Sequence, residues 1–341
     1  MKIHILLKIV NGPYGGSHQF LRALKKYFIK KGVYEDDPKK ADIILFNSCQ
    51  NMTKTAKIKL KYFNKIFVHR IDGPIRLYNN MCDKRDLVTN MGNELIADGT
   101  IFQSKWSREQ NYALGLKENN FETIIINTPD SSIFNRAGKV SSDENRKIRL
   151  IATSWSPNWN KGFDAYKWLD NNLDFSRYEM TFIGNSPIEF KNIKWIKPLP
   201  SEELAKQLKQ HDIYITASRK DPCSNSLIEA LHCGLPAIAY NDGGHPEIVD
   251  KGGELFNEPE EIPNLIEKII SNYDYYSSNI NLPTLDEVGE LYYKFMKNIY
   301  EKVESEEYSP KNFTYYDYLK IKSVVSYWKF SGVIFSIKNK L

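Results

Sequence analysis

The 341-residue sequence predicts an α/β protein built from two domains, each with a parallel sheet. Two observations lead to this prediction. Apolar, strand-like runs alternate with amphipathic stretches through the first half of the chain, and the same alternation begins again after residues 135–147. Those residues have no periodicity and are rich in Ser, Asn and charge, so they are predicted to link the two domains.

The composition is typical of a soluble globular protein, with 41% hydrophobic and 26% charged residues. The four cysteines have no spacing that suggests a zinc site, and reduced thiols in a cytosolic protein are expected. No apolar run is long enough to span a bilayer. The short apolar start of the chain is interpreted as a strand rather than as a signal peptide.

The net charge of +5 is concentrated at the C-terminal end of the chain. Residues 311–341 contain six lysines and one aspartate, so the positive and negative charges of the remaining residues balance. A basic surface is therefore expected only in this tail, and no nucleic-acid partner is predicted.

The first domain is predicted over residues 1–140 and opens with a buried parallel strand at residues 2–10. A glycine-rich loop and a helix from Ser17 follow, so the loop lies at the carboxyl end of the strand. Loops in that place bind ligands in open parallel sheets, which makes Gly15 and Gly16 candidates; a plain turn is the alternative. Further strands are predicted at 42–47, 65–69, 99–104 and 123–127, and helices at 83–97 and 106–114.

A second candidate group follows the predicted strand 65–69. His69, Arg70 and Asp72 occur at its carboxyl end, where titratable side chains that pack together often form a site. The alternative is structural, an Arg–Asp pair that holds the following turn.

The second domain is predicted over residues 141–304. A last segment, from about 305 to 341, is predicted to pack back on the first domain. Strands are expected at 148–153, 179–184, 193–196, 213–217 and 236–240, and helices from 201, at 224–233, 260–270 and 285–299.

The most informative stretch is the loop and helix over residues 218–234. Ser224 is suited to cap the start of the helix, and Gly234 is suited to follow its end. The N–H groups at a helix start, just beyond a strand carboxyl end, favour phosphate. Two acids, Asp221 in the loop and Glu229 in the helix, lie eight positions apart. A solvated helix face is the alternative reading of Glu229.

This stretch resembles the donor-site motif of the retaining glycosyltransferases of family four, also called glycosyl transferases group 1. That motif has two acids separated by seven residues, a Glu-Ala, a Gly-Leu-Pro turn, a Gly-Gly pair and Pro-Glu-Ile-Val. The family usually has Glu as the first acid, where this sequence has Asp221. The other matching residues are Glu229-Ala230, Gly234-Leu235-Pro236, Gly243-Gly244 and Pro246-Glu247-Ile248-Val249.

Two further features of the family occur outside this stretch. Asn127, Asp130 and Phe134 resemble its interdomain signature, and Lys161-Gly162 resembles a Lys-Gly pair that contacts the donor diphosphate. An Arg that the family carries nearby is absent, because positions 154–156 are Ser, Trp and Ser. The candidate replacements for this cation are Arg70, Arg219 and Lys220.

The resemblance implies a GT-B fold, in which two Rossmann-like domains face one another across a cleft. The second domain would hold a nucleotide sugar, UDP- or GDP-linked, and the first would hold a glycan or lipid-linked acceptor. The sugar would be transferred with retention of stereochemistry. Neither a metal nor another cofactor is expected.

The resemblance also implies roles for individual residues. Glu229 would bind the ribose hydroxyls, Asp221 the donor sugar and Lys161 the diphosphate. His69 would contact the donor sugar or the acceptor, which completes the four predicted catalytic residues. His245 and Glu247 are interpreted as structural. The predicted donor-binding residues are Gly15, Gly16, Arg70, Asp72, Ser224, Asn225, Ser226 and Leu227.

Other functions remain open at this point. An epimerase or phosphorylase of the same fold is one, although no lysine suggests a pyridoxal site. A nucleotide-sugar binder without turnover is another, motivated by Asp221 and the absent Arg. The amphipathic, cationic residues 320–341 also suit a membrane-surface scaffold. The predicted location is cytoplasmic, with contact to the cytoplasmic membrane face through this tail as the option.

Overall fold

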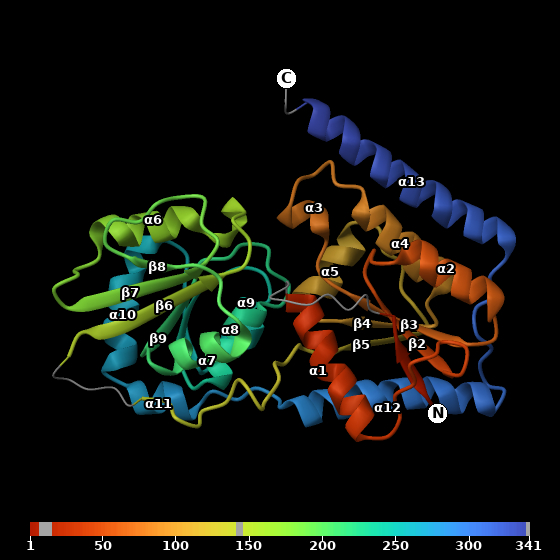
Figure 1. Cartoon of the computed structure of the whole chain (residues 1–341), viewed down its shortest axis with the longest axis horizontal. Helices are drawn as coiled ribbons and strands as arrows, with labels where there is room; N and C mark the ends of the chain where they lie inside the picture. Colours follow the sequence, from red (N-terminus) through yellow and green to blue (C-terminus); the bar gives the residue numbers. More distant parts are fainter. Residues whose placement is uncertain (7–15, 141–145, 339–341) are drawn as a thin grey trace. The chain divides into compact units, whose positions relative to one another are not determined.

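The computed structural model describes residues 1–6, 16–140 and 146–338, with the side chains of the last helix as far as Ser331. The chain divides into two compact units, which are visible in Figure 1. Unit 1 comprises Met1–Ile9, Leu21–Ile126 and Asp286–Leu341, and unit 2 comprises Val10–Phe20 and Asn127–Leu285.

Unit 1 is built on a five-stranded parallel sheet in the order β1-β2-β3-β4-β5. Every residue of β2 (Ile43–Asn47) and β3 (Ile66–Ile71) is buried, as their apolar runs predict for strands that are covered on both faces. The remaining strands are β1 (Ile3–Ile5), β4 (Gly99–Phe102) and β5 (Phe121–Ile124).

The helices of unit 1 come from both ends of the chain. Helix α12 (Leu285–Glu304) packs on α1 (Gly16–Lys30), since Tyr27 donates a 2.6 Å hydrogen bond to Glu290 and Lys31 forms an ion pair with the same carboxylate. The segment predicted as the end of the second domain therefore lies in unit 1. The other helices are α2 (Met52–Lys61), α3 (Ile75–Tyr78), α4 (Arg85–Ile96), α5 (Lys105–Ala113) and α13 (Tyr315–Lys338).

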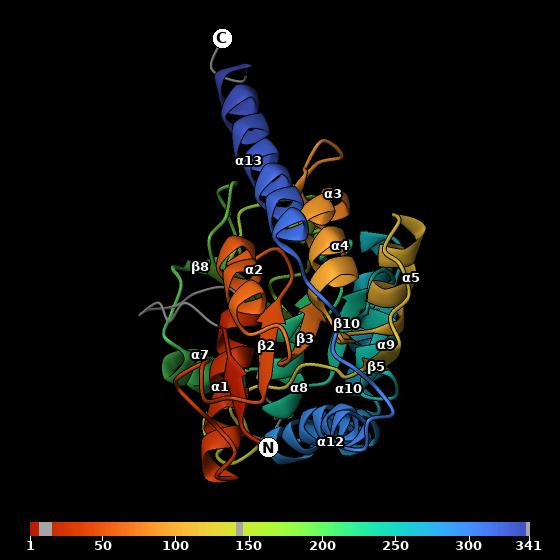
Figure 2. The ribbon, with the colours of Figure 1, turned by 90° about the vertical axis from the view of Figure 1, so that its right-hand side faces the viewer.

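The last helix, α13, packs along α2 and α4 (Figure 2). Ile321 and Val325 on α13 are buried in the core of unit 1. The chain that leads to α13 is fixed by the buried Asp98, whose carboxylate accepts hydrogen bonds from the Tyr308 hydroxyl at 3.0 Å and the Lys311 amide at 2.7 Å. Within unit 1 the start of the C-terminal tail is thus part of the packed structure.

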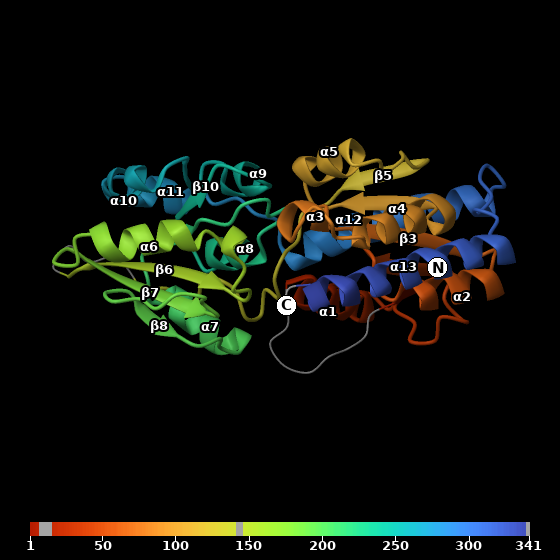
Figure 3. The same cartoon turned by 90° about the horizontal axis from the view of Figure 1, so that it is seen from above.

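Unit 2 has a six-stranded parallel sheet in the order β11-β10-β9-β6-β7-β8. Figure 3 labels β6, β7, β8 and β10 of this sheet. This is the doubly wound arrangement, in which the chain direction across the sheet reverses between β6 (Ile148–Ser154) and β9 (Ile213–Thr216). The remaining strands are β7 (Tyr178–Gly184), β8 (Lys194–Ile196), β10 (Ala237–Tyr240) and β11 (Gly253–Phe256).

Helices cover both faces of the sheet of unit 2. The apolar side chains of α6 (Phe163–Asn172) and α10 (Ile262–Ile270) form one core with the strands, while α7 (Ser201–Lys209) and α8 (Asn225–His232) lie on the face opposite α6 (Figure 1). The short elements are η1 (Trp159–Lys161), α9 (His245–Val249), η2 (Pro259–Glu261) and α11 (Tyr273–Ser278).

These two parallel-sheet units confirm the predicted fold class. The borders of the units differ from the predicted domains. The longer segment of unit 2 begins at Asn127, where residue 141 was predicted, and unit 1 takes up the chain again at Asp286, where a residue near 305 was predicted. Over the described ranges, the longest helices fall short of the combination of length and apolarity that crossing a membrane requires.

Candidate functional site

The carboxyl ends of β6 and β9 carry the main group of polar side chains in unit 2. Ligands of doubly wound sheets bind beyond this edge, where the strand order reverses. Lys161 comes from the loop after β6 and Asp221 from the loop after β9, and Lys161 Nζ lies 2.8 Å from Asp221 Oδ2. The Ser218 hydroxyl is 3.2 Å from each of these two atoms. Two of the predicted catalytic residues therefore meet at the edge of the sheet where a ligand is expected.

Gly162 explains how the two loops come so close. Its backbone is in the left-handed region, with φ of 80°. A Cβ at this position would lie 2.2 Å from the carbonyl oxygen of Ala217, at the end of β9. Only glycine combines this conformation with such a close approach, so Gly162 lets the loop that carries Lys161 lie against β9.

Asp221 is an ionised partner for Lys161. Burial acts to raise the pKa of the Asp221 carboxyl, but the charge of Lys161 and the hydrogen bonds from Lys161 and the Cys223 amide outweigh it, and the pKa lies below the ordinary value of 3.8. At neutral pH the pair is a carboxylate and an ammonium group.

The Gly-Gly part of the motif packs directly on Asp221. The Gly244 amide donates a 2.9 Å hydrogen bond to the backbone carbonyl of Asp221, and a Cβ at Gly243 would lie 2.2 Å from that oxygen. Next to this pair, His245 is fully buried and its Nδ1–H donates to the Tyr240 carbonyl at 2.9 Å. Its Nε2 has no hydrogen-bond partner in the described part of the chain. His245 is close enough to Asp221 for their charges to interact. The sequence did not predict this proximity, because a structural histidine and a site histidine have the same pattern.

The start of α8 supplies free hydrogen-bond donors. Ser224 occupies the cap position, as predicted, but its side chain makes no cap hydrogen bond, and its hydroxyl lies 3.3 Å from that of Ser226. Among the described residues, the backbone N–H groups of Ser224, Asn225, Ser226 and Leu227 have no acceptor. They are the unsatisfied first donors of a helix, and together with its dipole they favour an anion. The predicted donor-binding residues on α8 therefore have the chemistry that a phosphate requires.

Glu229 lies one turn after Asn225, on the same face of α8. It is half-buried, and within the described ranges its carboxyl has no hydrogen-bond partner. Burial raises the pKa of Glu229 from 4.5 to about 8. A ligand with hydroxyl groups would provide the partners that the protein does not.

Of the two glycines predicted to bind the donor near the start of α1, the structure describes only Gly16. Gly15 lies outside the described residues. Gly16 is the first residue of α1 and groups with unit 2, where a Cβ at this position would lie 1.9 Å from the Asn225 side-chain nitrogen. The Asn225 side chain also accepts a 3.1 Å hydrogen bond from Asn127 of the interdomain signature.

His69 was predicted at the carboxyl end of its strand. It lies instead within β3, in the core of unit 1. The ring is fully buried and stacks on Phe46 with 4.1 Å between ring centroids. Its nitrogens lie 3.2 Å from the Asn93 side chain and 3.0 Å from the Ser48 carbonyl. Burial lowers the pKa of His69 to about 4, so the ring is neutral. This geometry gives no support to the predicted contact with a substrate.

Arg70 and Asp72 form a closed network at the carboxyl ends of strands in unit 1. Arg70 is fully buried, and its Nη1 lies 2.9 Å from Asp72 and also donates to Asn47. Asp72 accepts a further 3.0 Å hydrogen bond from Ser48. The pair matches the structural alternative, and the role of Arg70 as a replacement for the absent Arg stays a prediction.

The other two candidates to replace the absent Arg, Arg219 and Lys220, differ in whether their charge is paired. The Arg219 guanidinium forms a 2.5 Å ion pair with Asp164 and lies over the ring of Tyr240. Lys220 is exposed, and its ammonium group has no partner among the residues that the structure describes. Of the three candidates, Lys220 is therefore the one with an uncompensated charge beside Asp221.

This group of side chains offers cations and N–H donors more than metal ligands. In the described ranges, no three His, Cys, Asp or Glu residues are arranged to hold a metal ion. Lys161, Lys220 and the first amides of α8 are instead suited to a phosphate or diphosphate.

Comparison with known sequences locates a family match in this unit. Residues 190–281 match the family model described as glycosyl transferases group 1, and the matched segment contains Asp221, Glu229 and all of α8. A probable sucrose-phosphate synthase of Thermosipho melanesiensis is 28% identical over 142 residues, which cover 40% of this chain. The match spans 33% of that relative's length.

Solved structures with a similar fold cover most of the chain. The sucrose-phosphate synthase of Thermosynechococcus elongatus has a TM-score of 0.55 at 15% identity, over 93% of this chain and 78% of that one. Alr3699/HepE of Anabaena, in complex with UDP-glucose, has a TM-score of 0.62 at 15% identity, over 89% of this chain and 100% of that one. At these identities the likeness concerns the fold. The GT-B fold and the family match over residues 190–281 together confirm the resemblance to glycosyl transferases group 1 that the sequence motifs indicated.

Proposed function

We propose that this protein is a retaining, metal-independent glycosyltransferase that moves a sugar from a nucleotide-sugar donor to a hydroxyl group of a glycan or lipid-linked acceptor. The observation that carries the proposal is the meeting of Lys161, Asp221 and the first amides of α8, which have no acceptor in the described part of the chain, at the edge of the sheet where the strand order reverses. The family match over the same residues supports it.

The donor diphosphate would bind at the start of α8. Lys161, Lys220 and the N–H groups of Ser224–Leu227 are its proposed partners, and their charge would stabilise the negative charge that develops on the leaving nucleotide. Lys161 is paired with Asp221 in the structure described above. A diphosphate would compete for that ammonium group and free an oxygen of Asp221 to accept a hydroxyl of the donor sugar.

The nucleoside would be held by Glu229, whose carboxyl lacks a partner among the described residues and would bind the ribose hydroxyls. The Anabaena neighbour was solved with UDP-glucose, which supports a UDP-linked donor here; a GDP-linked donor is the alternative. The acceptor would bind to unit 1, and the reaction is proposed to take place in the cytoplasm.

The proposed reaction needs no nucleophile from the protein. The bond between the anomeric carbon and the donor phosphate oxygen breaks. A new bond forms on the same face of the sugar to the acceptor oxygen, and the leaving phosphate oxygen takes the acceptor proton. Lys161 and the amides of α8 take the electrostatic part that a metal ion takes in other transferases.

An assay of purified full-length protein with UDP- and GDP-sugars tests the proposal. We expect release of a nucleoside diphosphate together with transfer to an acceptor, and a loss of about 100-fold in rate for Lys161→Met. Glu229→Ala is expected to raise the KM for the donor. Turnover that is equally fast in both variants would contradict the proposed site.

A nucleotide-sugar binder without turnover is the second candidate. Two observations favour it, the aspartate at position 221 and the absence of the family's Arg at positions 154–156. The same assay separates the two, because a binder gives a calorimetric signal with a nucleotide sugar and no product with any acceptor of a broad panel.

A further inference from the structure

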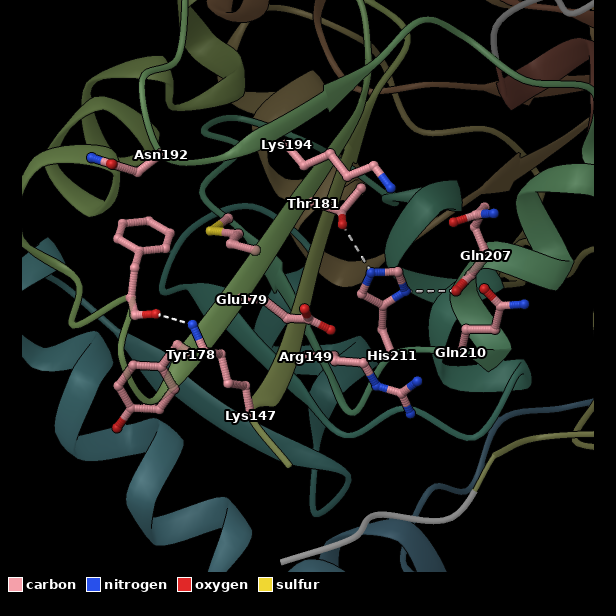
Figure 4. Close-up of a pocket in the computed structure, with 12 residues that line it drawn as sticks. Lys147, Arg149, Tyr178, Glu179, Thr181, Asn192, Lys194, Gln207, Gln210 and His211 are labelled. Carbon is pink, nitrogen blue, oxygen red and sulfur yellow. Dashed lines mark hydrogen bonds between the residues drawn. The ribbon is translucent and has the colours of Figure 1, made fainter. Parts of the chain in front are cut away.

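Unit 2 contains a second polar site, at the opposite edge of its sheet from Lys161 and Asp221. A cavity of about 390 Å³ lies at the amino ends of β6, β7 and β8 and is bordered by α7 (Figure 4). The strands run parallel, so this edge is separated from the carboxyl ends by the length of the strands. The cavity is therefore no part of the proposed donor site.

The walls of the cavity carry more positive than negative charge. Lys147, Arg149 and Lys194 line it, and Glu179 is the acid among the lining residues. Lys194 is exposed, and the described residues offer its ammonium group no partner. Lys147 donates to the Phe175 carbonyl at 2.6 Å, and its charge also acts on the neighbouring Asp174 carboxylate.

Arg149 is the most buried of these three cations. Its Nε and Nη2 are buried and have no hydrogen-bond partner among the described residues. The neighbouring carboxylate of Asp212 is 3.7 Å from Nε, and it already accepts hydrogen bonds of 2.7 and 2.8 Å from Arg146. One carboxylate is thus shared by two guanidinium groups, and the excess positive charge of Arg146 and Arg149 is stabilised by an anion in the adjoining cavity.

Neutral groups complete the wall along α7. His211 Nδ1–H donates to the Gln207 carbonyl at 2.7 Å, so its Nε2 accepts from the Thr181 hydroxyl at 3.0 Å. Burial, reinforced by the charge of Arg149, lowers the pKa of His211 to about 4, and the ring stays neutral. The side-chain amides of Gln207 and Gln210 lie beside this ring (Figure 4) and have no partner among the described residues.

We propose that this cavity binds a phosphomonoester with a hydroxylated body, such as a sugar phosphate. The phosphoryl group is held by Arg149 and Lys194, and Gln207 and Gln210 donate to its oxygens. Glu179 disfavours a bare multivalent anion, whereas its carboxylate accepts hydrogen bonds from hydroxyl groups. The volume also exceeds what a phosphate ion alone fills. The site is distinct from the donor site, so its occupant is an additional ligand.

Calorimetric titration of the full-length protein with glucose 6-phosphate, inorganic phosphate and glucose tests the proposal. We expect glucose 6-phosphate to bind more tightly than inorganic phosphate and glucose not to bind. Lys194→Gln is expected to weaken glucose 6-phosphate about tenfold, since it removes one charge-assisted contact from an exposed position where folding is unaffected. Arg149→Gln is expected to weaken it further, and Glu179→Gln to tighten inorganic phosphate.

Two control variants locate the binding. Lys167→Gln removes an exposed charge from α6, outside the cavity, and is expected to leave the affinity unchanged. Lys161→Met removes the main cation of the donor site and is also expected to leave it unchanged. Affinity that is lost in Lys161→Met but kept in Lys194→Gln overturns the proposal, and so does the absence of any binding of glucose 6-phosphate.

Discussion

Lys161 and Asp221 are separated by 60 positions in sequence and by 2.8 Å in the structure. Their types and their neighbours in sequence suggested a site, and the strand order of unit 2 explains why they meet. Each follows one of the two strands between which the order reverses, so their loops leave the sheet side by side. Lys161 and Asp221 therefore meet because the loops that carry them leave the same edge of the sheet.

Glu229 provides a test at the level of a single ionisable group. Its pKa is 4.5 in the unfolded chain and about 8 in the folded protein. Folding therefore retains a proton that the unfolded chain loses, and the free energy of unfolding falls as the pH rises from about 4.5 through 8. Glu229→Gln removes this loss. We expect the variant to be more stable than the wild type by about 2 kcal/mol at pH 8.5, with no difference at pH 4.

Urea unfolding curves across this pH range measure the effect. The matched control is Glu203→Gln on α7, an exposed glutamate in the same unit, for which we expect no pH-dependent difference. A constant offset between Glu229→Gln and wild type at all pH values would show that the carboxyl keeps its ordinary pKa.

Lys220 provides a second test at the residue scale. If it replaces the family's absent Arg, Lys220→Ala removes a cation from the diphosphate site and we expect the Kd for a nucleoside diphosphate to rise about tenfold. Lys206→Ala on α7, which also removes an exposed charge from unit 2, is the control. Equal affinities of the two variants in calorimetry would leave the diphosphate with Lys161 and α8 alone.

The sequence predicted residue types better than residue environments. His69 has the position in sequence of a strand-end histidine, yet its side chain points into the core between Phe46 and Asn93. Arg70 and Asp72 are paired with each other rather than exposed to a ligand. Local pattern does not encode which way a side chain near a strand end turns, because that depends on the helices packed against it.

At the scale of the element, the helix and strand assignments around the site were predictable. The helix predicted over residues 224–233 is α8, with Ser224 at its cap and Gly234 after its end at φ of 86°. Capping and glycine signals are local, so a single sequence is sufficient to place them. The position of α12 was not predictable, because its amphipathic pattern does not reveal that Tyr27 and Lys31 of unit 1 bind it.

Gly162 gives a prediction at this scale, because it sets the approach of the loop after β6 to β9. Gly162→Ala combines a left-handed backbone with a Cβ 2.2 Å from the Ala217 carbonyl. We expect the free energy of unfolding of the variant to be about 3 kcal/mol lower than that of the wild type. We also expect the variant to bind the donor poorly, because Lys161 is displaced.

Gly138→Ala is a control for the backbone conformation alone. Gly138 also lies in unit 2 and has φ of 76°, but a Cβ there meets nothing within 4 Å. We expect the free energy of unfolding of this variant to fall by about 1 kcal/mol and its affinity for the donor to stay unchanged. Similar losses in the two variants, measured by urea unfolding, would show that the close approach to Ala217 is unimportant.

At the scale of the whole molecule, α13 has one buried and one exposed face. Ile321 and Val325 pack in the core of unit 1, while Tyr327 and Phe330 are 54% and 72% exposed and lie near the exposed Lys322 and Lys329. We propose that this face contacts anionic membranes. The sequence pattern alone did not decide between packing and membrane contact, because apolar side chains on a helix can pack against the protein or contact a membrane.

Flotation with vesicles that contain phosphatidylserine tests this contact. Tyr327→Ser combined with Phe330→Ser keeps the packed face and is expected to reduce the floated fraction severalfold, because aromatic side chains anchor at the membrane interface. Tyr275→Ser, at a position of unit 2 that is also 54% exposed, is the control. Wild-type protein that remains at the bottom of the gradient would contradict membrane contact.

The group formed by Lys161, Asp221 and the start of α8 is central to the proposed activity, and the binding of a nucleoside diphosphate tests it most directly. Calorimetric titration of UDP and GDP into the full-length protein and into Lys161→Met is the measurement. We predict that one of the two nucleotides binds the wild type and that Lys161→Met weakens it by about 30-fold or more. Binding of neither nucleotide, or equal affinity of the variant and the wild type, would contradict a donor site at this edge of the sheet.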